Sequence, residues 1–351
     1  MYLPALASHP DAHVVAVCGR DPTKADDFAT RWSIPQVFCD PAEMIEKGKL
    51  QALIVASAND SHYAITMAAL RAGLHVLCEK PLALSYAQAL EMATLATQKG
   101  VKHMTPFTYR YMPTTRYLKA LIDEGYLGRP YHLNMRYYTG FGRGSDYVWR
   151  FDVGKAGAGA LGDIGSHFLY LATWFFGKVE ALSCQLGFMV ERPPRNPEGR
   201  PYERGDDLAT LVLSFANGAQ GVVQLSTLAY EDTAFGQTHQ MEFHGSEGTL
   251  HHVIDWDHEQ RLSGARLGQG AVKPLSVPDR YWNGLRRDSV HNTYRDVFRT
   301  QNVMARQFVS AIVTDAPLDP NFYDGAYVQR LVQAGVISHR KRRWVEIDEV
   351  Q

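Results

Sequence analysis

Residues 72–81 read Ala-Gly-Leu-His-Val-Leu-Cys-Glu-Lys-Pro and contain a short apolar run, Leu74–Cys78. A run of this length, with a glycine before it and charged residues after it, is typical of a buried strand. The charged residues Glu79 and Lys80 follow the run directly. Because ligands in open α/β sheets bind beyond the carboxyl ends of the strands, the segment predicts both a parallel strand and a ligand-binding edge.

Three further apolar runs of similar length occur in the first third of the chain, and longer amphipathic stretches separate them. Helix-start signals precede two of these stretches, since Asp40 and Ser85 each stand three residues before an acid or an amide. This alternation indicates βαβ units, so residues 1–106 are predicted to form an α/β domain with a doubly wound parallel sheet. The four predicted strands are His13–Cys18, Ala52–Ala56, Leu74–Cys78 and Val101–Met104.

The pattern changes after residue 106. Asn217-Gly218 joins two runs that alternate apolar and polar residues, which is the strongest short signal for a hairpin. We therefore expect residues 107–351 to form an α+β domain with a largely antiparallel sheet. The expected strands are Tyr131–Tyr138, Leu208–Phe215, Gln220–Ser226, Met241–His244, Thr249–Ile254 and Trp344–Ile347, and the expected helices are Pro113–Glu124, Leu161–Phe176 and Ala326–His339.

Charge and composition exclude several classes of protein. The 351 residues include 36 Lys and Arg against 37 Asp and Glu, so no field of one sign favours nucleic acid or an anionic membrane. No apolar run reaches membrane-spanning length, and no signal peptide is recognisable. The basic run His339–Arg343 is interpreted as a solvated helix end, whose cations complement the helix dipole. We expect no nucleic-acid or membrane partner.

The cysteines and histidines do not form a metal-binding pattern. The four cysteines lie far apart in the sequence and lack the paired spacing of metal ligands. His251 and His252 are adjacent, so on a strand they would point to opposite faces and could not easily share an ion. We expect no metal site, and unpaired thiols place the chain in a reducing cytoplasm.

Lys80 is the first candidate for chemistry. At the edge of a crevice its ammonium group can polarise an oxygen or exchange a proton with it. The plainer interpretation is that Lys80 only pairs with Glu79 at the end of a strand, and the residues alone do not separate the two.

Asp163 and His167 form the second candidate, at the start of an aromatic-rich helix. Residues four apart lie on one helical face, where a carboxylate can orient an imidazole and stabilise its protonated form. The competing interpretation is an aspartate that caps the helix start beside a histidine of the core.

The pattern Gly-x-Gly-x-x-Gly occurs once, at Gly157–Gly162. A dinucleotide-binding loop requires a strand before it, inside a βαβ unit. The preceding residues 149–155 are polar and lie outside the βαβ half, so we interpret the pattern as a glycine-rich turn into a helix with some other role.

The two candidate segments together resemble the signature of the glucose–fructose oxidoreductase/inositol dehydrogenase (Gfo/Idh/MocA) family of NAD(P)-dependent dehydrogenases. Members carry Glu-Lys-Pro at the end of a Rossmann strand and Asp-x-Gly-x-His at a helix start. Glu79–Pro81 and Asp163–His167 match these motifs. Weaker matches lie at Asn59–His62, Arg110–Pro113, Trp149-Arg150 and Asp324-Gly325.

The resemblance implies a Rossmann-like first domain and hydride transfer between a nicotinamide and a sugar, cyclitol or related alcohol or carbonyl substrate. Lys80, Asp163 and His167 would form the catalytic group: His167, assisted by Lys80, exchanges the hydroxyl proton, and Asp163 positions His167. A homo-oligomer that pairs through the sheet of the second domain is also implied. The implied cofactor contacts are Gly19, Arg20, Asn59, His62, Glu79 and Lys80, and the implied substrate contacts are Arg110, Trp149, Arg150 and Tyr170.

Two local departures from the family pattern bear on the ligands. Family members often carry an acid where this chain has Tyr170, so a polyol-type substrate contact is in question. Many members end the second strand with an Asp for the adenosine ribose, whereas this chain has Gly19-Arg20. Gly19 removes a carboxylate that would repel a phosphate and Arg20 can pair with one, so between NAD and NADP the sequence favours NADP.

A third departure concerns the start of the chain. The family begins with a strand and a glycine-rich loop, whereas residues 1–9 match the latter part of the helix that follows that loop. We expect the strands His13–Cys18 and Ala52–Ala56 each to lack a neighbour, the chain to be less stable than its relatives and poor at binding dinucleotide, and the natural protein to start upstream. A catalytically impaired nucleotide-binding or regulatory protein on the same fold is the competing hypothesis.

Overall fold

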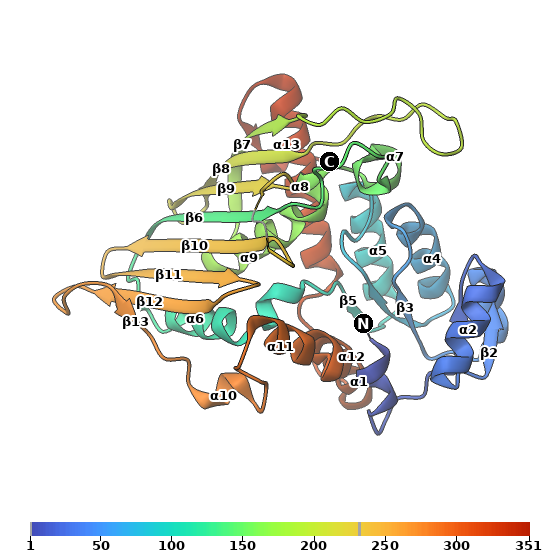
Figure 1. Cartoon of the computed structure of the whole chain (residues 1–351). Helices are drawn as coiled ribbons and strands as arrows, with labels where there is room; N and C mark the ends of the chain where they lie inside the picture. Colours follow the sequence, from blue (N-terminus) through green and yellow to red (C-terminus); the bar gives the residue numbers. More distant parts are fainter. Residues whose placement is uncertain (1, 231–232) are drawn as a thin grey trace. The chain divides into compact units, whose positions relative to one another are not determined.

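The computed structural model describes residues 2–230 and 233–351 (Figure 1). These residues form two compact units. The first unit holds the residues up to Pro106 together with Arg295–Ala326, and the second holds Phe107–Tyr294 with Tyr327–Gln351. Met1, where the predicted first domain begins, lies outside the described residues.

Five short strands among the described residues of the first unit form two parallel sheets. β1 (Ala16–Cys18) pairs with β2 (Gln36–Phe38), while β3 (Ala52–Val55), β4 (His75–Cys78) and β5 (His103–Met104) form the other sheet. The predicted parallel pairing is confirmed, but the sheet is in two parts. Within the described part of the chain no ladder joins β1 to β3. The sequence did not predict β2, which is only three residues long.

Both helix starts predicted from capping signals are confirmed. The Asp40 side chain accepts a hydrogen bond from the Ala42 backbone N–H at 2.8 Å, and Ser85 accepts one from the Gln88 backbone N–H at 3.3 Å. These bonds satisfy backbone donors that have no partner inside the helix. The helices of the first unit before residue 106 are α1 (Leu3–Ala7), α2 (Pro22–Trp32), α3 (Pro41–Lys47), α4 (Asn59–Arg71) and α5 (Tyr86–Gln98).

Arg295–Ala326 packs with the first unit, whereas the sequence-based division assigned it to the second domain. Phe322 is fully buried in the core of the first unit, with its ring 5.0 Å from that of His103. Arg306 also donates a hydrogen bond to the Ser8 hydroxyl at 2.5 Å. Contacts over such sequence separations leave no trace in local periodicity. The segment includes the π-helical turn η3 (Asp296–Thr300), α12 (Val303–Thr314) and the first residues of α13 (Phe322–Lys341).

A nine-stranded sheet dominates the described part of the second unit (Figure 1). Its strands are β6 (Pro130–Thr139), β7 (Val179–Gly187), β8 (Leu208–Phe215), β9 (Gln220–Ser226), β10 (Gln237–Gly245), β11 (Gly248–Asp255), β12 (Gln260–Arg266), β13 (Lys273–Pro274) and β14 (Val345–Glu346). Their order is β13-β12-β11-β10-β6-β9-β8-β7-β14. Only β6 and β9 pair in parallel among these strands, which confirms the predicted largely antiparallel sheet. Asn217-Gly218 forms the predicted hairpin turn, and Gly218 has a φ of +84°.

Helices cover one face of this sheet. The aromatic side chains of α9 (Gly165–Phe176) pack onto the strands, with Phe175 4.9 Å from Phe243 and Phe176 5.7 Å from Phe215 between ring centroids. The predicted helix Leu161–Phe176 is thus present, but it is interrupted at residue 164. The remaining helical elements are α6 (Pro113–Asp123), α7 (Val153–Ala156), α8 (Ala160–Asp163), α10 (Asp279–Trp282), α11 (Val290–Arg295), and the 3-10 helices η1 (Thr108–Tyr111), η2 (Trp149–Phe151) and η4 (Ile347–Glu349).

Residues 2–230 and 233–351 contain neither a membrane-spanning helix nor a metal-binding cluster. No helix there has both the length and the apolar character needed to cross a membrane. No cluster of three or more His, Cys, Asp or Glu side chains there is arranged to hold a metal ion.

Candidate active site

The Glu79-Lys80-Pro81 turn follows β4 and is held by hydrogen bonds within the first unit. The backbone N–H of Glu79 donates to the Val55 carbonyl at 2.9 Å and extends the pairing with β3. The Glu79 carboxylate accepts hydrogen bonds from the Tyr2 hydroxyl and from the Lys80 backbone N–H, the latter at 3.3 Å. Lys80 therefore lies in a turn whose backbone is fixed by its neighbours.

His62 on α4 is completely buried and holds the same turn. Its Nδ1 lies 2.9 Å from the Pro81 carbonyl oxygen, and its Nε2 lies 3.2 Å from the Ser57 carbonyl oxygen. Because both partners only accept, an imidazolium that donates from both nitrogens fits the site better than a neutral ring. Burial acts to lower the pKa of His62, but Cys78 and the two carbonyls outweigh burial and raise the pKa to about 9.

Asn59 lies at the same edge of the sheet as Lys80. It is the first residue of α4, separated from the end of β3 by three residues, and it is buried. Because β3 and β4 are parallel neighbours, the residues that follow their carboxyl ends meet at one edge. The structure thus brings together the predicted residues Asn59, His62, Glu79 and Lys80.

Gly19 and Arg20 follow β1, which belongs to the other sheet of the first unit. The Gly19 N–H donates to the Phe38 carbonyl at 3.0 Å, and the Arg20 side chain is exposed. The neighbouring Asp21 carboxylate caps α2 by accepting a hydrogen bond from the Lys24 backbone N–H at 3.2 Å. The acid next to Arg20 is therefore engaged with its own helix.

Asp163 and His167 lie on either side of a short break between two helices of the second unit. α8 ends at Asp163, Ile164 joins the helices, and α9 follows. The Ser166 hydroxyl donates to the Asp163 carbonyl at 3.0 Å across this break. His167 is buried, with about 6% of its surface exposed. The predicted spacing of one helical turn is present, although the helix is not continuous.

Arg150 contacts the Asp163 carboxylate. Its Nε lies 3.2 Å from Asp163 Oδ2, and its guanidinium lies 4.6 Å from the centre of the Trp149 ring. Two residues predicted to bind substrate, Trp149 and Arg150, are therefore stacked on each other, and one of them is paired with a predicted catalytic residue.

A shell of aromatic and polar side chains lies against the His167 imidazole. The Tyr109 ring lies 4.5 Å from the His167 ring and 4.4 Å from the His239 ring. The Tyr109 hydroxyl is hydrogen-bonded to the Tyr137 hydroxyl at 2.8 Å and accepts from Gln237 Nε2 at 3.2 Å. Burial raises the pKa of both tyrosines and lowers the pKa of His239. These groups therefore stay uncharged near neutral pH and hold the imidazole between packed side chains.

Sequence reasoning missed this shell because its members come from η1, β6 and β10, which are far apart along the chain. One local signal was available. Gln237 and His239 are two residues apart on a strand, and this spacing places both side chains on one face. Nothing local indicates that Tyr109 and Tyr137 would meet there.

Arg110 and Tyr170, both predicted substrate contacts, bind each other. An Arg110 guanidinium N–H donates to the Tyr170 hydroxyl, and the guanidinium lies 4.6 Å from the centre of the Trp174 ring. The Tyr170 ring is stacked on Phe107, with centroids 4.2 Å apart and planes 6° apart. Tyr170 thus sits in an aromatic stack with its hydroxyl group in contact with a cation.

The glycine-rich turn Gly157–Gly162 holds a carboxylate of its own unit. The backbone N–H groups of Gly159 and Leu161 donate to the Asp206 carboxylate at 2.9 and 2.8 Å. The amides that a phosphate would need are therefore already occupied. The predicted glycine-rich turn into a helix is present, and it leads into α8.

The donor groups of the first unit suit the two ends of a dinucleotide. An amide and an ammonium group, from Asn59 and Lys80, stand at the carboxyl edge of β3 and β4, the edge at which ligands bind in open α/β sheets. Gly19 and Arg20 stand at the end of β1, where the adenosine end binds. The amide of Asn59, the ammonium group of Lys80 and the guanidinium of Arg20 are therefore of the chemical kind that can bind a dinucleotide.

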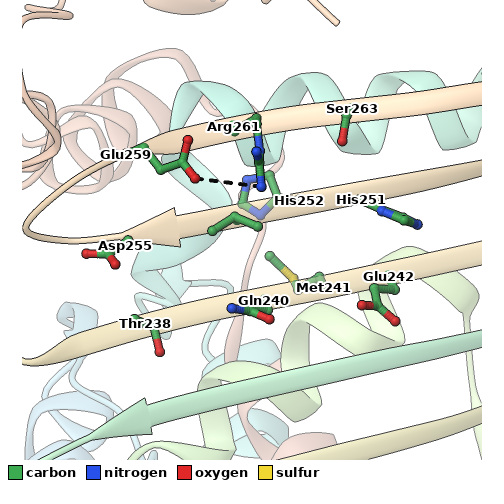
Figure 2. Close-up of a pocket in the computed structure, with 11 residues that line it drawn as sticks. Thr238, Gln240, Met241, Glu242, His251, His252, Asp255, Glu259, Arg261 and Ser263 are labelled. Atoms are coloured by element: carbon green, nitrogen blue, oxygen red, sulfur yellow. Dashed lines mark ion pairs between the residues drawn. The ribbon is translucent and has the colours of Figure 1, made fainter. Parts of the chain in front are cut away.

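A groove crosses the outer face of the nine-stranded sheet, over β10, β11 and β12 (Figure 2). Its lining is mostly polar and includes Glu242, His251 and the ion pair between Glu259 and Arg261, whose charged atoms are 3.6 Å apart. Of the described residues that line it, none belongs to the predicted catalytic or binding set. The groove is separate from the candidate active site.

Parallel strands with polar groups at their carboxyl edge and a helix start with Asp163 and His167 are features of a two-domain, NAD(P)-dependent oxidoreductase. The comparison with protein families agrees. The family model "Oxidoreductase family, NAD-binding Rossmann fold" matches residues 1–107, and the model "Oxidoreductase family, C-terminal alpha/beta domain" matches residues 119–347. The chain belongs to the Gfo/Idh/MocA family of oxidoreductases, as the sequence motifs predicted.

Individual relatives cover nearly the whole chain. Levoglucosan dehydrogenase of Pseudarthrobacter phenanthrenivorans is 28% identical and covers 94% of this chain and 88% of its own length. D-apiose dehydrogenase of Paraburkholderia graminis is 23% identical, over 97% of this chain and 84% of its own length. A solved structure of levoglucosan dehydrogenase with NADH and levoglucosan superposes with a TM-score of 0.87 at 27% identity, covering 99% of this chain and 95% of that one.

Proposed function

We propose that this chain is a dehydrogenase that oxidises a hydroxyl group of a sugar, a cyclitol or a related alcohol, or reduces the corresponding carbonyl. The observation that carries the proposal is the pair Asp163 and His167, one helical turn apart, in a chain whose relatives include dehydrogenases named for levoglucosan and D-apiose. The nicotinamide cofactor, when bound, supplies the hydride acceptor or donor.

The chain's own residues have the task of moving the hydroxyl proton. The imidazole of His167 takes this proton as the substrate is oxidised and returns it in the reverse direction. Lys80 assists by placing its ammonium group on the substrate oxygen. Asp163, supported by Arg150, orients the His167 imidazole, and the packed ring of Tyr109 keeps that imidazole in place.

A substrate panel tests the proposal directly. The purified chain is incubated with NAD or NADP and a series of anhydrosugars, aldoses, cyclitols and simple secondary alcohols, and reduced cofactor is followed by its absorbance. Turnover of at least one polyhydroxylated compound in preference to simple alcohols is the expected result. Cofactor binding without turnover of any compound would favour the catalytically impaired regulatory protein instead.

The cofactor is proposed to be NADP in preference to NAD. An exposed arginine follows a glycine at the end of β1, and the neighbouring Asp21 carboxylate is engaged in capping α2. Arg20→Ala should therefore weaken NADP binding about tenfold or more and leave NAD binding nearly unchanged, since a charge-assisted bond to phosphate contributes about 1.5–3 kcal/mol. An equal loss for the two cofactors, measured by titration calorimetry, would show that Arg20 does not contact the 2′-phosphate.

A homo-oligomer through the outer face of the nine-stranded sheet is proposed as the assembly. Val212 and Val222 are directly opposite each other on β8 and β9 and are 39% and 38% exposed, which leaves an apolar spot at the middle of that face. Val222→Lys should shift the oligomer towards monomer in light scattering at micromolar concentration. Leu90→Lys, at a similarly exposed site on α5 of the first unit, should not. A monomeric wild-type chain contradicts the proposal.

The cytoplasm is proposed as the compartment. All four cysteines, each within the described residues, are free, and this state suits a reducing environment.

A further inference from the structure

The start of α8 is anchored to Asp206 through three backbone N–H groups. The Asp206 carboxylate accepts from Gly159 and Leu161 at 2.9 and 2.8 Å, and the Asp206 carbonyl accepts from Ala160 at 2.8 Å. The approach is so close that a Cβ at Gly159 would lie 2.0 Å from the Asp206 carbonyl oxygen. A Cβ at Gly205 would in turn lie 2.8 Å from the Gly159 nitrogen. The two segments can therefore approach this closely only because positions 159 and 205 are glycines.

The anchored residues support Asp163 directly. The Asp163 backbone N–H donates to the Gly159 carbonyl at 3.0 Å, and the Ile164 N–H donates to the Ala160 carbonyl at 3.1 Å. A shift of Gly159 or Ala160 would move Asp163 and the break that precedes His167. The position of the catalytic pair is thus coupled to the contact with Asp206.

The other side of Asp206 is also fixed. Its neighbour Asp207 forms a fully buried ion pair with Arg192 at 2.5 Å and accepts hydrogen bonds from the backbone N–H groups of Met189 and Val190 at 2.7 and 2.9 Å. Two adjacent carboxylates therefore serve two different segments. Asp206 holds the start of α8, and Asp207 holds the chain that follows β7.

Burial and hydrogen bonding act in opposite directions on the pKa of Asp206. Burial raises its pKa to about 6, the backbone N–H groups of Leu161 and Gly159 act in the opposite direction, and the charge of Asp207 adds to the increase. Burial raises the pKa of the Cys184 thiol, and the charge of Asp206 adds to this increase. Near neutral pH the Asp206 carboxylate is ionised and accepts both hydrogen bonds.

We propose that Asp206 is a positioning residue for the reaction: its carboxylate fixes the start of α8 and thereby sets the place of Asp163 and His167. This inference rests on the proposed function, because it assigns those two residues to catalysis. It also gives the glycine-rich turn Gly157–Gly162 its role, which is to let Asp206 approach the backbone.

The test compares Asp206→Asn with the matched variant Asp207→Asn. An asparagine at 206 keeps the shape of the side chain but has one acceptor oxygen, so its amide NH2 group faces one of the two N–H donors. Hydrogen exchange, measured by mass spectrometry on the full chain, should become faster over residues 157–167 in Asp206→Asn. In Asp207→Asn it should become faster over residues 188–193 instead. Should Asp206→Asn not yield folded protein, Asp206→Ser, which keeps one acceptor, is measured in its place.

Kinetics form the second arm. We expect kcat of Asp206→Asn to fall about 10-fold to 100-fold while KM changes little, because the reacting atoms require tighter placement than binding does. Asp207→Asn should keep a kcat near that of the wild type even though it loses stability. Equal loss of kcat in both variants, or exchange unchanged over 157–167, would overturn the proposal. The exchange arm needs no turnover, so a wild-type chain that oxidises nothing refutes the proposed function and leaves the anchor to be decided by exchange.

Discussion

His62 makes the stability of this protein depend on pH in a direction that can be worked out from the structure. The imidazole is fully buried between the carbonyl oxygens of Pro81 and Ser57. Its pKa is raised from 6.5 to about 9. The perturbation is His62→Gln, which removes the titrating group and can donate to only part of the same site. We expect the variant to lose the part of the stability that requires a charged imidazole.

The magnitude follows from proton linkage. Below about pH 6.5 both the folded and the unfolded chain hold the His62 proton. The contribution of the charged imidazole to the free energy of unfolding is then fully present. Between about pH 6.5 and 9 only the folded chain holds the proton, so the free energy of unfolding falls as pH rises. A pKa difference of about 2.5, at about 1.4 kcal/mol for each pH unit, amounts to about 3.5 kcal/mol in total. Most of it, about 2–3 kcal/mol, is lost between about pH 7 and pH 9.5.

Urea unfolding followed by circular dichroism at several pH values between these limits measures the effect. The difference in unfolding free energy between wild type and His62→Gln should shrink by that amount as pH rises. His252→Gln is the matched control: this histidine is equally buried and is hydrogen-bonded to Thr114 at 2.9 Å, but burial lowers its pKa to about 3. His252 carries almost no charge above about pH 7 in either the folded or the unfolded chain. The difference in unfolding free energy between wild type and His252→Gln should therefore not change with pH. A flat difference for His62→Gln would refute the reasoning.

Two further predictions concern the second unit and the proposed catalytic residues. Gly159→Ala should lower the free energy of unfolding by about 3 kcal/mol, because its Cβ would overlap the backbone of Asp206. Gly144→Ala, whose Cβ would meet nothing within 4 Å, should be neutral in the same urea titration. Lys80→Ala and His167→Ala should each reduce kcat by about 10²–10⁴-fold with the fold intact by circular dichroism. Near-normal kcat in both of these variants would remove them from the proposed catalytic group.

Local pattern was enough for much of the fold. The hairpin around Asn217-Gly218 was predicted with the strand bounds that the structure has, because alternation and a turn residue with positive φ are properties of neighbouring residues. The β4 strand and the helix starts at Asp40 and Ser85 were predicted for the same reason. The packing of Arg295–Ala326 with the first unit was not predicted, because it depends on contacts between residues far apart in the sequence, such as Phe322 and His103.

The sequence by itself determined the family, the two kinds of sheet and the short motifs around Lys80 and His167, because each of these depends on residues that are adjacent or one helical turn apart. Only the tertiary structure decided what those motifs touch. It placed Tyr109 against His167, Arg150 on Asp163, and the Asp206 carboxylate on the backbone N–H of Gly159 in the glycine-rich turn. Each of these contacts joins residues that lie tens of positions apart or come from different elements, and such pairs are fixed by packing and burial rather than by local spacing.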